Sequence, residues 1–155
     1  MTGTLRERLI GAWELIELVE QPEDGSPGRY PMGEDAAGLI LYSADGFMSV
    51  QIMQRGHTAA EAGGDDPYGR TAEDFAAEAR TYFAYAGSFE VDEDRRLVTH
   101  LVRTSLYPGW VGQAQRRAVR LEGGVLELSS AEPSLSAGVP VRTRLRWRRA
   151  ALTRV

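Results

Sequence analysis

The sequence predicts a mainly β domain in which antiparallel strands form a closed barrel or a sandwich and one helix interrupts them. Outside two polar segments, apolar and polar residues mostly alternate with a period of two, which is typical of half-buried strands. Short turn sequences at residues 44–46, 92–94 and 123–124 join successive strand candidates as hairpins. Closing such a sheet into a barrel removes its exposed edges, and an eight-stranded barrel holds side chains or one small ligand.

Eight strands are expected, at residues 12–20, 38–43, 47–53, 85–91, 96–105, 113–122, 125–130 and 142–149. The helix lies between the third and fourth strands. Thr71 and Asp74 resemble the capping box that begins a helix. An apolar face then starts at Phe75 and extends to residues 82–84. We expect this helix either to plug the barrel or to cover it as a lid.

The length of 155 residues fits one domain, residues 1–155. Two polar segments, residues 21–38 and 54–70, show no periodicity and are expected to be long loops. No apolar run approaches the roughly 20 residues that span a bilayer, and the N-terminus lacks the apolar core of a signal peptide. We therefore expect a cytoplasmic protein without a membrane partner. The absence of Cys excludes disulfides, thiolate metal sites and cysteine nucleophiles.

Gly11, Ala12 and Trp13 open the first strand in the way that the G-x-W element opens lipocalin barrels. Further segments with the same resemblance follow in order: residues 30–34 (YPMGE), 38–49 (GLILYSADGFMS), 85–89 (YAGSF), 98–100 (VTH), 105–112 (SLYPGWVG), 117 (R) and 145–149 (LRWRR). With this ordered set the chain resembles the bacterial and fungal lipocalin-like domain family from about residue 5 to 150. The resemblance implies an eight-stranded antiparallel calycin-type barrel with a ligand-sized cavity, and it does not name the ligand.

The first strand places Trp13, Leu15 and Glu17 on one face. In lipocalin geometry Trp13 points into the closed end of the barrel. Arg149, which follows Trp147 by two residues, would then lie over the indole and gain about 0.5–2 kcal/mol of cation–π energy. We expect Trp13 and Arg149 to form the barrel floor and to have no catalytic role.

Three residues are candidates for chemistry: Glu17, His100 and Arg117. Inward parity would raise the pKa of Glu17 by desolvation and make it a general acid or base, unless the strand bulges and the carboxylate reaches solvent. His100 lies mid-strand among apolar neighbours and is either an acid–base group or a hydrogen-bonded structural histidine. Arg117 is an inward candidate that needs a partner, such as Glu17 or a ligand oxyanion; a salt bridge at the rim is the alternative.

The expected ligand-binding residues are bulky or polar side chains on strands, the helix or loops: Tyr42, Gln51, Met53, Tyr82, Tyr85, Trp110 and Gln115. Tyr and Trp fill apolar space and still offer a hydrogen-bonding group, although ordinary core packing is the alternative for each. His57 lies in a polar segment and is expected to be exposed. With two His and no Cys, no metal site is expected. No nucleotide-binding or nucleophile-elbow motif occurs, so no cofactor is expected.

The charges are segregated along the chain. Residues 1–94 hold 6 Arg and 19 acidic residues, a net charge of −13, and residues 95–155 hold 12 Arg and 3 acidic residues, a net charge of +9. A basic half is a possible nucleic-acid footprint. However, the arginines of the last strand alternate as an outward stripe, and barrel closure would place them beside outward Glu14 and Glu20 of the first strand. We therefore expect neutralisation across the barrel seam and no nucleic-acid partner.

Three functions follow from these observations. The leading hypothesis is a cofactor-independent cyclase or isomerase of a small, largely apolar, secondary-metabolite-like substrate, in which Glu17, His100 or Arg117 polarises a carbonyl or moves a proton. The alternative is a non-catalytic carrier or sensor of a hydrophobic ligand. A binding module that uses the arginine-rich half is the third. An enzyme requires converging polar groups with a perturbed pKa, whereas a carrier requires only volume and apolar lining. The expected assembly is a monomer or homodimer.

Overall fold

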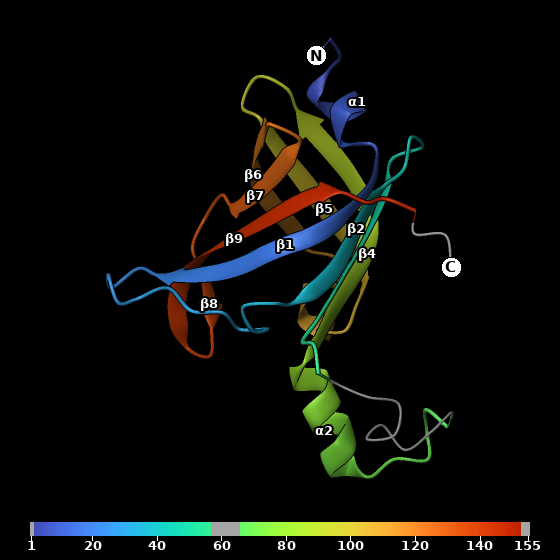
Figure 1. Ribbon diagram of the computed structural model, residues 1–155, viewed down its shortest axis with the longest axis vertical. Coiled ribbons are helices and arrows are strands. Elements are labelled where there is room, and N and C mark those ends of the chain that lie inside the picture. The colour runs from blue at the N-terminus through green and yellow to red at the C-terminus, as the bar shows by residue number, and fades with distance from the viewer. Residues whose placement is uncertain (1, 57–65, 153–155) are drawn as a thin grey trace.

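The computed structural model describes residues 2–56 and 66–152. Within these residues the strands are β1 (Gly11–Pro22), β2 (Ala37–Tyr42), β3 (Phe47–Met53), β4 (Tyr82–Asp92), β5 (Leu97–Ser105), β6 (Ala114–Glu122), β7 (Val125–Ser130), β8 (Ser134–Ser136) and β9 (Val139–Arg149). They pair in the order β1-β2-β3-β4-β5-β6-β7-β9-β8, and β1 also pairs with β9. All the pairings are antiparallel, and the last one closes the sheet into a barrel (Figure 1).

The predicted fold class is confirmed. Each of the eight expected strands is present, and the three predicted turns connect β2 to β3, β4 to β5 and β6 to β7. The additional strand β8 forms a short hairpin with β9 and pairs with no other strand in the described part of the chain. It therefore lies beside the barrel wall and does not change the closed circuit of eight strands.

A β-bulge interrupts β1. Its pairing with β9 shifts register between Leu15 and Glu17, so that Leu15 faces Trp147 and Glu17 faces Arg146. Before the bulge the buried residues are Trp13 and Leu15, and after it they are Leu18, Glu20 and Pro22. The expected strict alternation along the first strand is therefore wrong beyond Leu15, because one extra residue exchanges the inward and outward faces.

The seam between β1 and β9 brings unlike charges together, as expected from barrel closure. Arg148 lies 3.3 Å from Glu14, and Arg144 lies 3.4 Å from Glu17. The expected outward position of Glu20 is wrong because of the bulge, and Glu17 occupies the seam instead. Each exposed pair of this kind contributes only about 0–1 kcal/mol, so the seam specifies pairing more than it adds stability.

A short helix closes one end of the barrel, as Figure 1 shows for α1 (Leu5–Leu9). Its Leu5 and Leu9 are buried, and the indole nitrogen of Trp13 donates a hydrogen bond to the Leu9 carbonyl at 2.9 Å. The guanidinium of Arg149 lies 3.8 Å from the Trp13 ring centre and donates to the Ile10 carbonyl at 2.7 Å. The structure thus places the expected floor pair at this closed end.

Gly11 has two reasons to be a glycine. Its φ is +122°, in the region that L side chains rarely adopt. A Cβ at this position would also lie 2.7 Å from an Arg149 guanidinium nitrogen. The glycine of the G-x-W element therefore provides room for the arginine that covers the tryptophan.

The helix α2 (Ala72–Arg80) begins at the predicted capping box, in which Thr71 and Asp74 exchange hydrogen bonds. It ends before Tyr82, which begins β4. None of its residues is buried, none lines the barrel cavity, and the helix projects away from the barrel (Figure 1). The expected plug or lid is therefore wrong, because the large apolar side chains after Phe75 that were assigned to the helix belong to β4. Within residues 2–56 and 66–152, no helix combines the length and apolarity needed to cross a membrane.

Replacing Arg149 with Gln should lower the free energy of unfolding by about 1–3 kcal/mol, because the variant loses charged hydrogen bonds and the cation–π contact. Arg148→Gln is the matched control, since it removes only an exposed seam pair and should cost less than about 1 kcal/mol. Urea denaturation of both variants measures the difference. Equal losses would show that Arg149 has no special role at the floor.

Candidate functional site

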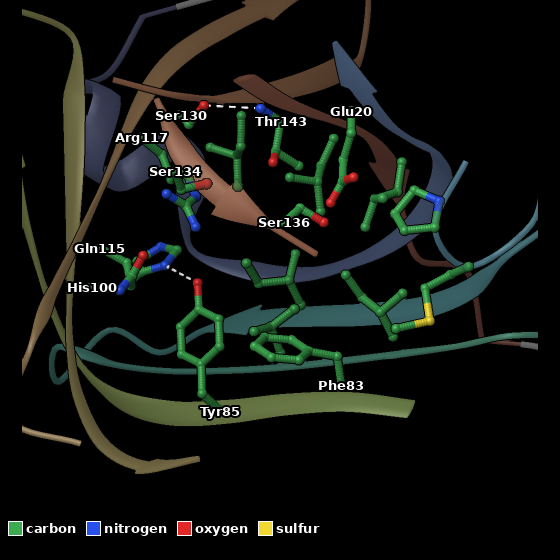
Figure 2. A pocket seen from close by; sticks show the side chains of 18 of the residues that line it. Glu20, Phe83, Tyr85, His100, Gln115, Arg117, Ser130, Ser134, Ser136 and Thr143 are labelled. Atoms are coloured by element: carbon green, nitrogen blue, oxygen red, sulfur yellow. Dashed lines mark hydrogen bonds between the residues drawn. The ribbon is translucent and has the colours of Figure 1, made fainter. Parts of the chain in front are cut away.

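The barrel encloses a cavity of about 300 Å³ (Figure 2). This volume lies at the lower end of the range for small-molecule sites. Most of the wall is apolar and includes Leu18, Ile40, Val50, Ile52, Phe83, Leu128, Leu145 and Trp147. Polar side chains gather at one side, where Tyr85, His100, Gln115 and Arg117 lie together, and Glu20 lies away from them beyond Ser136 (Figure 2).

His100 forms the centre of a buried hydrogen-bonded chain. It points inward from β5 and is 1% exposed. Its Nε2 lies 2.7 Å from the Tyr42 hydroxyl, and its Nδ1 lies 2.7 Å from the Tyr85 hydroxyl. Burial, assisted by the positive charge of Arg117, lowers the pKa of His100 to about 3. The imidazole is therefore neutral at physiological pH.

The chain Tyr42–His100–Tyr85 has a preferred direction. A neutral imidazole offers one N–H donor and one acceptor nitrogen. If Nε2 carried the proton, the O–H of Tyr42 would have no acceptor among the described residues, although Tyr42 is only 2% exposed. An unsatisfied buried donor costs about 1–3 kcal/mol. The favoured tautomer therefore has Tyr42 donating to Nε2 and Nδ1–H donating to Tyr85, which frees the Tyr85 O–H to donate into the cavity.

Arg117 lies beside this chain. It projects from β6, and its neighbour on the same face, Gln115, pairs with His100 in the β5–β6 register. Burial raises the pKa of Tyr85, whereas the nearby positive charge of Arg117 acts in the opposite direction. In the part of the chain that the structure describes, no carboxylate forms a salt bridge with Arg117. Its guanidinium donates to the Arg116 carbonyl at 3.1 Å and keeps further N–H groups free of described acceptors.

Glu20 is the carboxylate that lies inside, and sequence reasoning placed it outside. It is 8% exposed and accepts a hydrogen bond from Arg29 at 2.9 Å. Arg29 also donates to the Ser136 carbonyl at 2.9 Å, so it ties the segment between β1 and β2 to the β8 hairpin. The signal for this arrangement is a pair of adjacent apolar residues, Leu15 and Ile16, which breaks the alternation where the bulge occurs.

The remaining residues predicted from the sequence divide into those that line the cavity and those that do not. Five predicted residues line the cavity: Tyr85, His100, Trp110, Gln115 and Arg117. Tyr42 is buried and reaches the cavity through its hydrogen bond to His100. His57 lies outside the described residues.

Four candidates do not face the cavity. Glu17 is displaced to the outer face by the bulge and pairs with Arg144 and Arg146. Gln51 and Met53 have the wrong parity, because the buried residues of β3 are Met48, Val50 and Ile52. Tyr82 is exposed and pairs with Met53 at the outer face. The expected inward orientation of these four side chains is therefore corrected.

Other lining residues were not foreseen. Phe83 was assigned to the helix, and Ser134 and Ser136 belong to the unpredicted strand β8. Among the described residues, no group of three or more His, Asp or Glu is arranged to hold a metal ion. The polar groups present suit recognition of an oxygen-containing organic molecule.

The family profile described as lipocalin-like domain matches residues 10–150. The chain belongs to the lipocalin-like domain family. A curated relative, the 4'-hydroxy-3'-methoxypropiophenone carrier protein ppsC of Aspergillus oryzae, is 37% identical over an alignment of 108 residues, and the alignment covers 66% of this chain and 96% of the relative. The resemblance seen in the sequence is thus confirmed at the level of the family.

The buried neutral His100 should make stability depend on pH. Its folded pKa of about 3 lies below the ordinary value of 6.5, so below pH 6.5 the unfolded chain takes up a proton that the folded chain does not. The unfolding equilibrium constant should therefore rise by about tenfold per pH unit from about pH 6 down to pH 3 through this group alone. Denaturation curves of wild type and His100→Gln across this range isolate the effect, because all other titrating groups are shared. Parallel pH profiles would contradict it.

Proposed function

We propose that this protein binds and carries a small, largely apolar organic molecule in the barrel cavity. The observation that carries the proposal is the cavity itself, which combines an apolar wall with a compact polar group at one side. Lining of this kind is typical of small-molecule sites, where a few polar groups fix the orientation of the ligand. The volume corresponds to roughly ten molecules of liquid water, which suits an aromatic ring with a short side chain.

The family relative supports this ligand class. Its name describes a carrier of 4'-hydroxy-3'-methoxypropiophenone, a small aromatic ketone. Such a molecule has an apolar ring and oxygen atoms that can accept hydrogen bonds. We therefore use it as a probe of this cavity.

The chemistry of the polar groups favours carrying over conversion. His100 is neutral, and both of its ring nitrogens are engaged with tyrosines. Glu20 is held by Arg29. Among the described lining residues, none of the usual basic groups is therefore free to remove a proton from a ligand, whereas Tyr85 and Arg117 offer donors that bind one.

Blocking the cavity should abolish binding. Ile52→Trp fills the interior from β3, and Met53→Trp places the same side chain on the exposed outer face of the same strand. Calorimetric titration with 4'-hydroxy-3'-methoxypropiophenone should show binding to wild type and Met53→Trp and none to Ile52→Trp.

A second blocking variant keeps the test valid if Ile52→Trp does not fold. Ser134→Trp adds bulk at an exposed lining position on β8 and avoids overpacking the core. Circular dichroism should show native strand content in both variants. Undiminished binding to two folded, blocked variants would exclude the cavity as the site.

The second candidate function is a cofactor-independent isomerase or cyclase. It is favoured by the convergence of Tyr85, His100 and Arg117 and by the strongly lowered pKa of His100. In this function Tyr85 and Arg117 stabilise the negative charge that develops on a carbonyl oxygen during enolisation, while a base from solution takes the α-proton and a solvent proton is later returned to the carbon.

Proton exchange separates the two functions. The α-protons of the propiophenone probe exchange with D₂O through an enol, and nuclear magnetic resonance follows the loss of their signal. A carrier should leave the exchange at the buffer rate. Acceleration that disappears in Arg117→Gln but persists in Arg116→Gln, its exposed neighbour, would instead establish enolisation chemistry.

A further inference from the structure

We propose that the cavity selects organic oxyanions, and that the charged oxygen of the ligand is bound by the Tyr85 hydroxyl and the Arg117 guanidinium. In this proposal Tyr42 and His100 are positioning residues that direct the Tyr85 O–H toward the ligand. The inference rests on the proposed carrier function and specifies its ligand class.

The polar wall has more donors than acceptors. The tautomer that satisfies Tyr42 frees the O–H of Tyr85, and Arg117 has N–H groups with no described acceptor. The side chain of Gln115, which offers an NH₂ donor as well as an acceptor oxygen, also lines the cavity. These side chains line the cavity, so a ligand that places an acceptor oxygen at this wall can receive hydrogen bonds from them.

The positive charge of Arg117 at this wall also lacks a counterion within residues 2–56 and 66–152. The side chains around Arg117 are Tyr85 from β4, His100 from β5 and Ser130, its partner on β7. All of these are neutral at physiological pH. The inward carboxylate of Glu20 is already paired with Arg29. A half-buried cation that has no counterion among the described residues favours a ligand that brings a negative charge, because hydrogen bonds between charged groups are the stronger ones.

A matched pair of probes tests the charge preference: 2-naphthoate and its neutral isostere 2-naphthamide, titrated calorimetrically at pH 7. Wild type should bind the carboxylate at least about tenfold more tightly, which corresponds to one charged hydrogen bond. Arg117→Gln should lower this ratio to near one while keeping affinity for the amide. Arg116→Gln, on the outer face of the same strand, should leave the ratio unchanged.

A second probe reports the ionisation state of a bound phenol. The phenolate of 4-nitrophenol is yellow, and a positive, hydrogen-bonding site lowers the pKa of a bound phenol. At pH 6, wild type should increase the yellow absorbance and Arg117→Gln should not. An increase without naphthoate selectivity would restrict the site to phenolates, and the reverse would restrict it to carboxylates; either result supports an oxyanion site.

Tyr85→Phe and Tyr42→Phe test the positioning. Tyr85→Phe should reduce the carboxylate-to-amide ratio because it removes the donor, and Tyr42→Phe should reduce it less, because the His100 tautomer is then no longer fixed. Unchanged ratios in both folded variants would remove the tyrosines from the proposal.

The experiments distinguish a failure of the carrier function from a failure of the oxyanion preference. If wild type binds neither naphthalene probe nor the propiophenone probe, the carrier function itself is wrong. If it binds naphthoate and naphthamide equally and leaves the colour of 4-nitrophenol unchanged, the carrier function stands and the oxyanion preference is overturned.

Discussion

The antiparallel pairing of β1 with β9 is the interaction on which the rest of the structure depends. It converts an open sheet into a closed wall and gives the chain an interior. β9 contributes Thr143, Leu145 and Trp147 to the cavity, and β1 contributes Leu18 and Glu20. Outside, the same two strands bring the acidic first part of the chain against its arginine-rich end. The charge asymmetry of the sequence is thus a property of closure, and unlike charges at the seam favour this pairing over a shifted one.

The bulge in β1 decides which carboxylate lies inside. With regular alternation Glu17 would face the apolar interior, and Arg144 and Arg146 would lose their partner. The extra residue turns Glu17 outward to the arginines and turns Glu20 inward, where Arg29 neutralises it. One irregularity therefore places both carboxylates beside cations, and it leaves Arg117 as a cavity cation without a described carboxylate partner.

The success of prediction from sequence follows from how regular each strand is. The inward direction of His100 and Arg117 was predicted correctly because β5 and β6 pair without a register shift, and because His100 lies between the buried Val98 and Val102. Gln51 and Met53 were misplaced because β2 and β3 carry apolar residues on both faces, with Leu39 and Leu41 each 44% exposed, so periodicity did not identify the inner face. Leu15 and Ile16 break the alternation of the first strand, but whether such a break becomes a bulge depends on the pairing with β9. The strand β8 has only three residues, two of them serines, and gives no periodic signal.

One tautomer of His100 is favoured by three features together: its low pKa, the burial of Tyr42 and the charge of Arg117. A protonated imidazole would donate from both nitrogens, which would leave the Tyr42 O–H without an acceptor and set a second positive charge near Arg117. Arg117 disfavours that state, and so does desolvation. The neutral tautomer that remains accepts a hydrogen bond from Tyr42 and donates one to Tyr85. The O–H of Tyr85 is then free to point toward the cavity. The pKa of the buried His100 is too low for its imidazole to act as a base. Its role is instead to direct the Tyr85 O–H toward an acceptor oxygen of a ligand in the cavity.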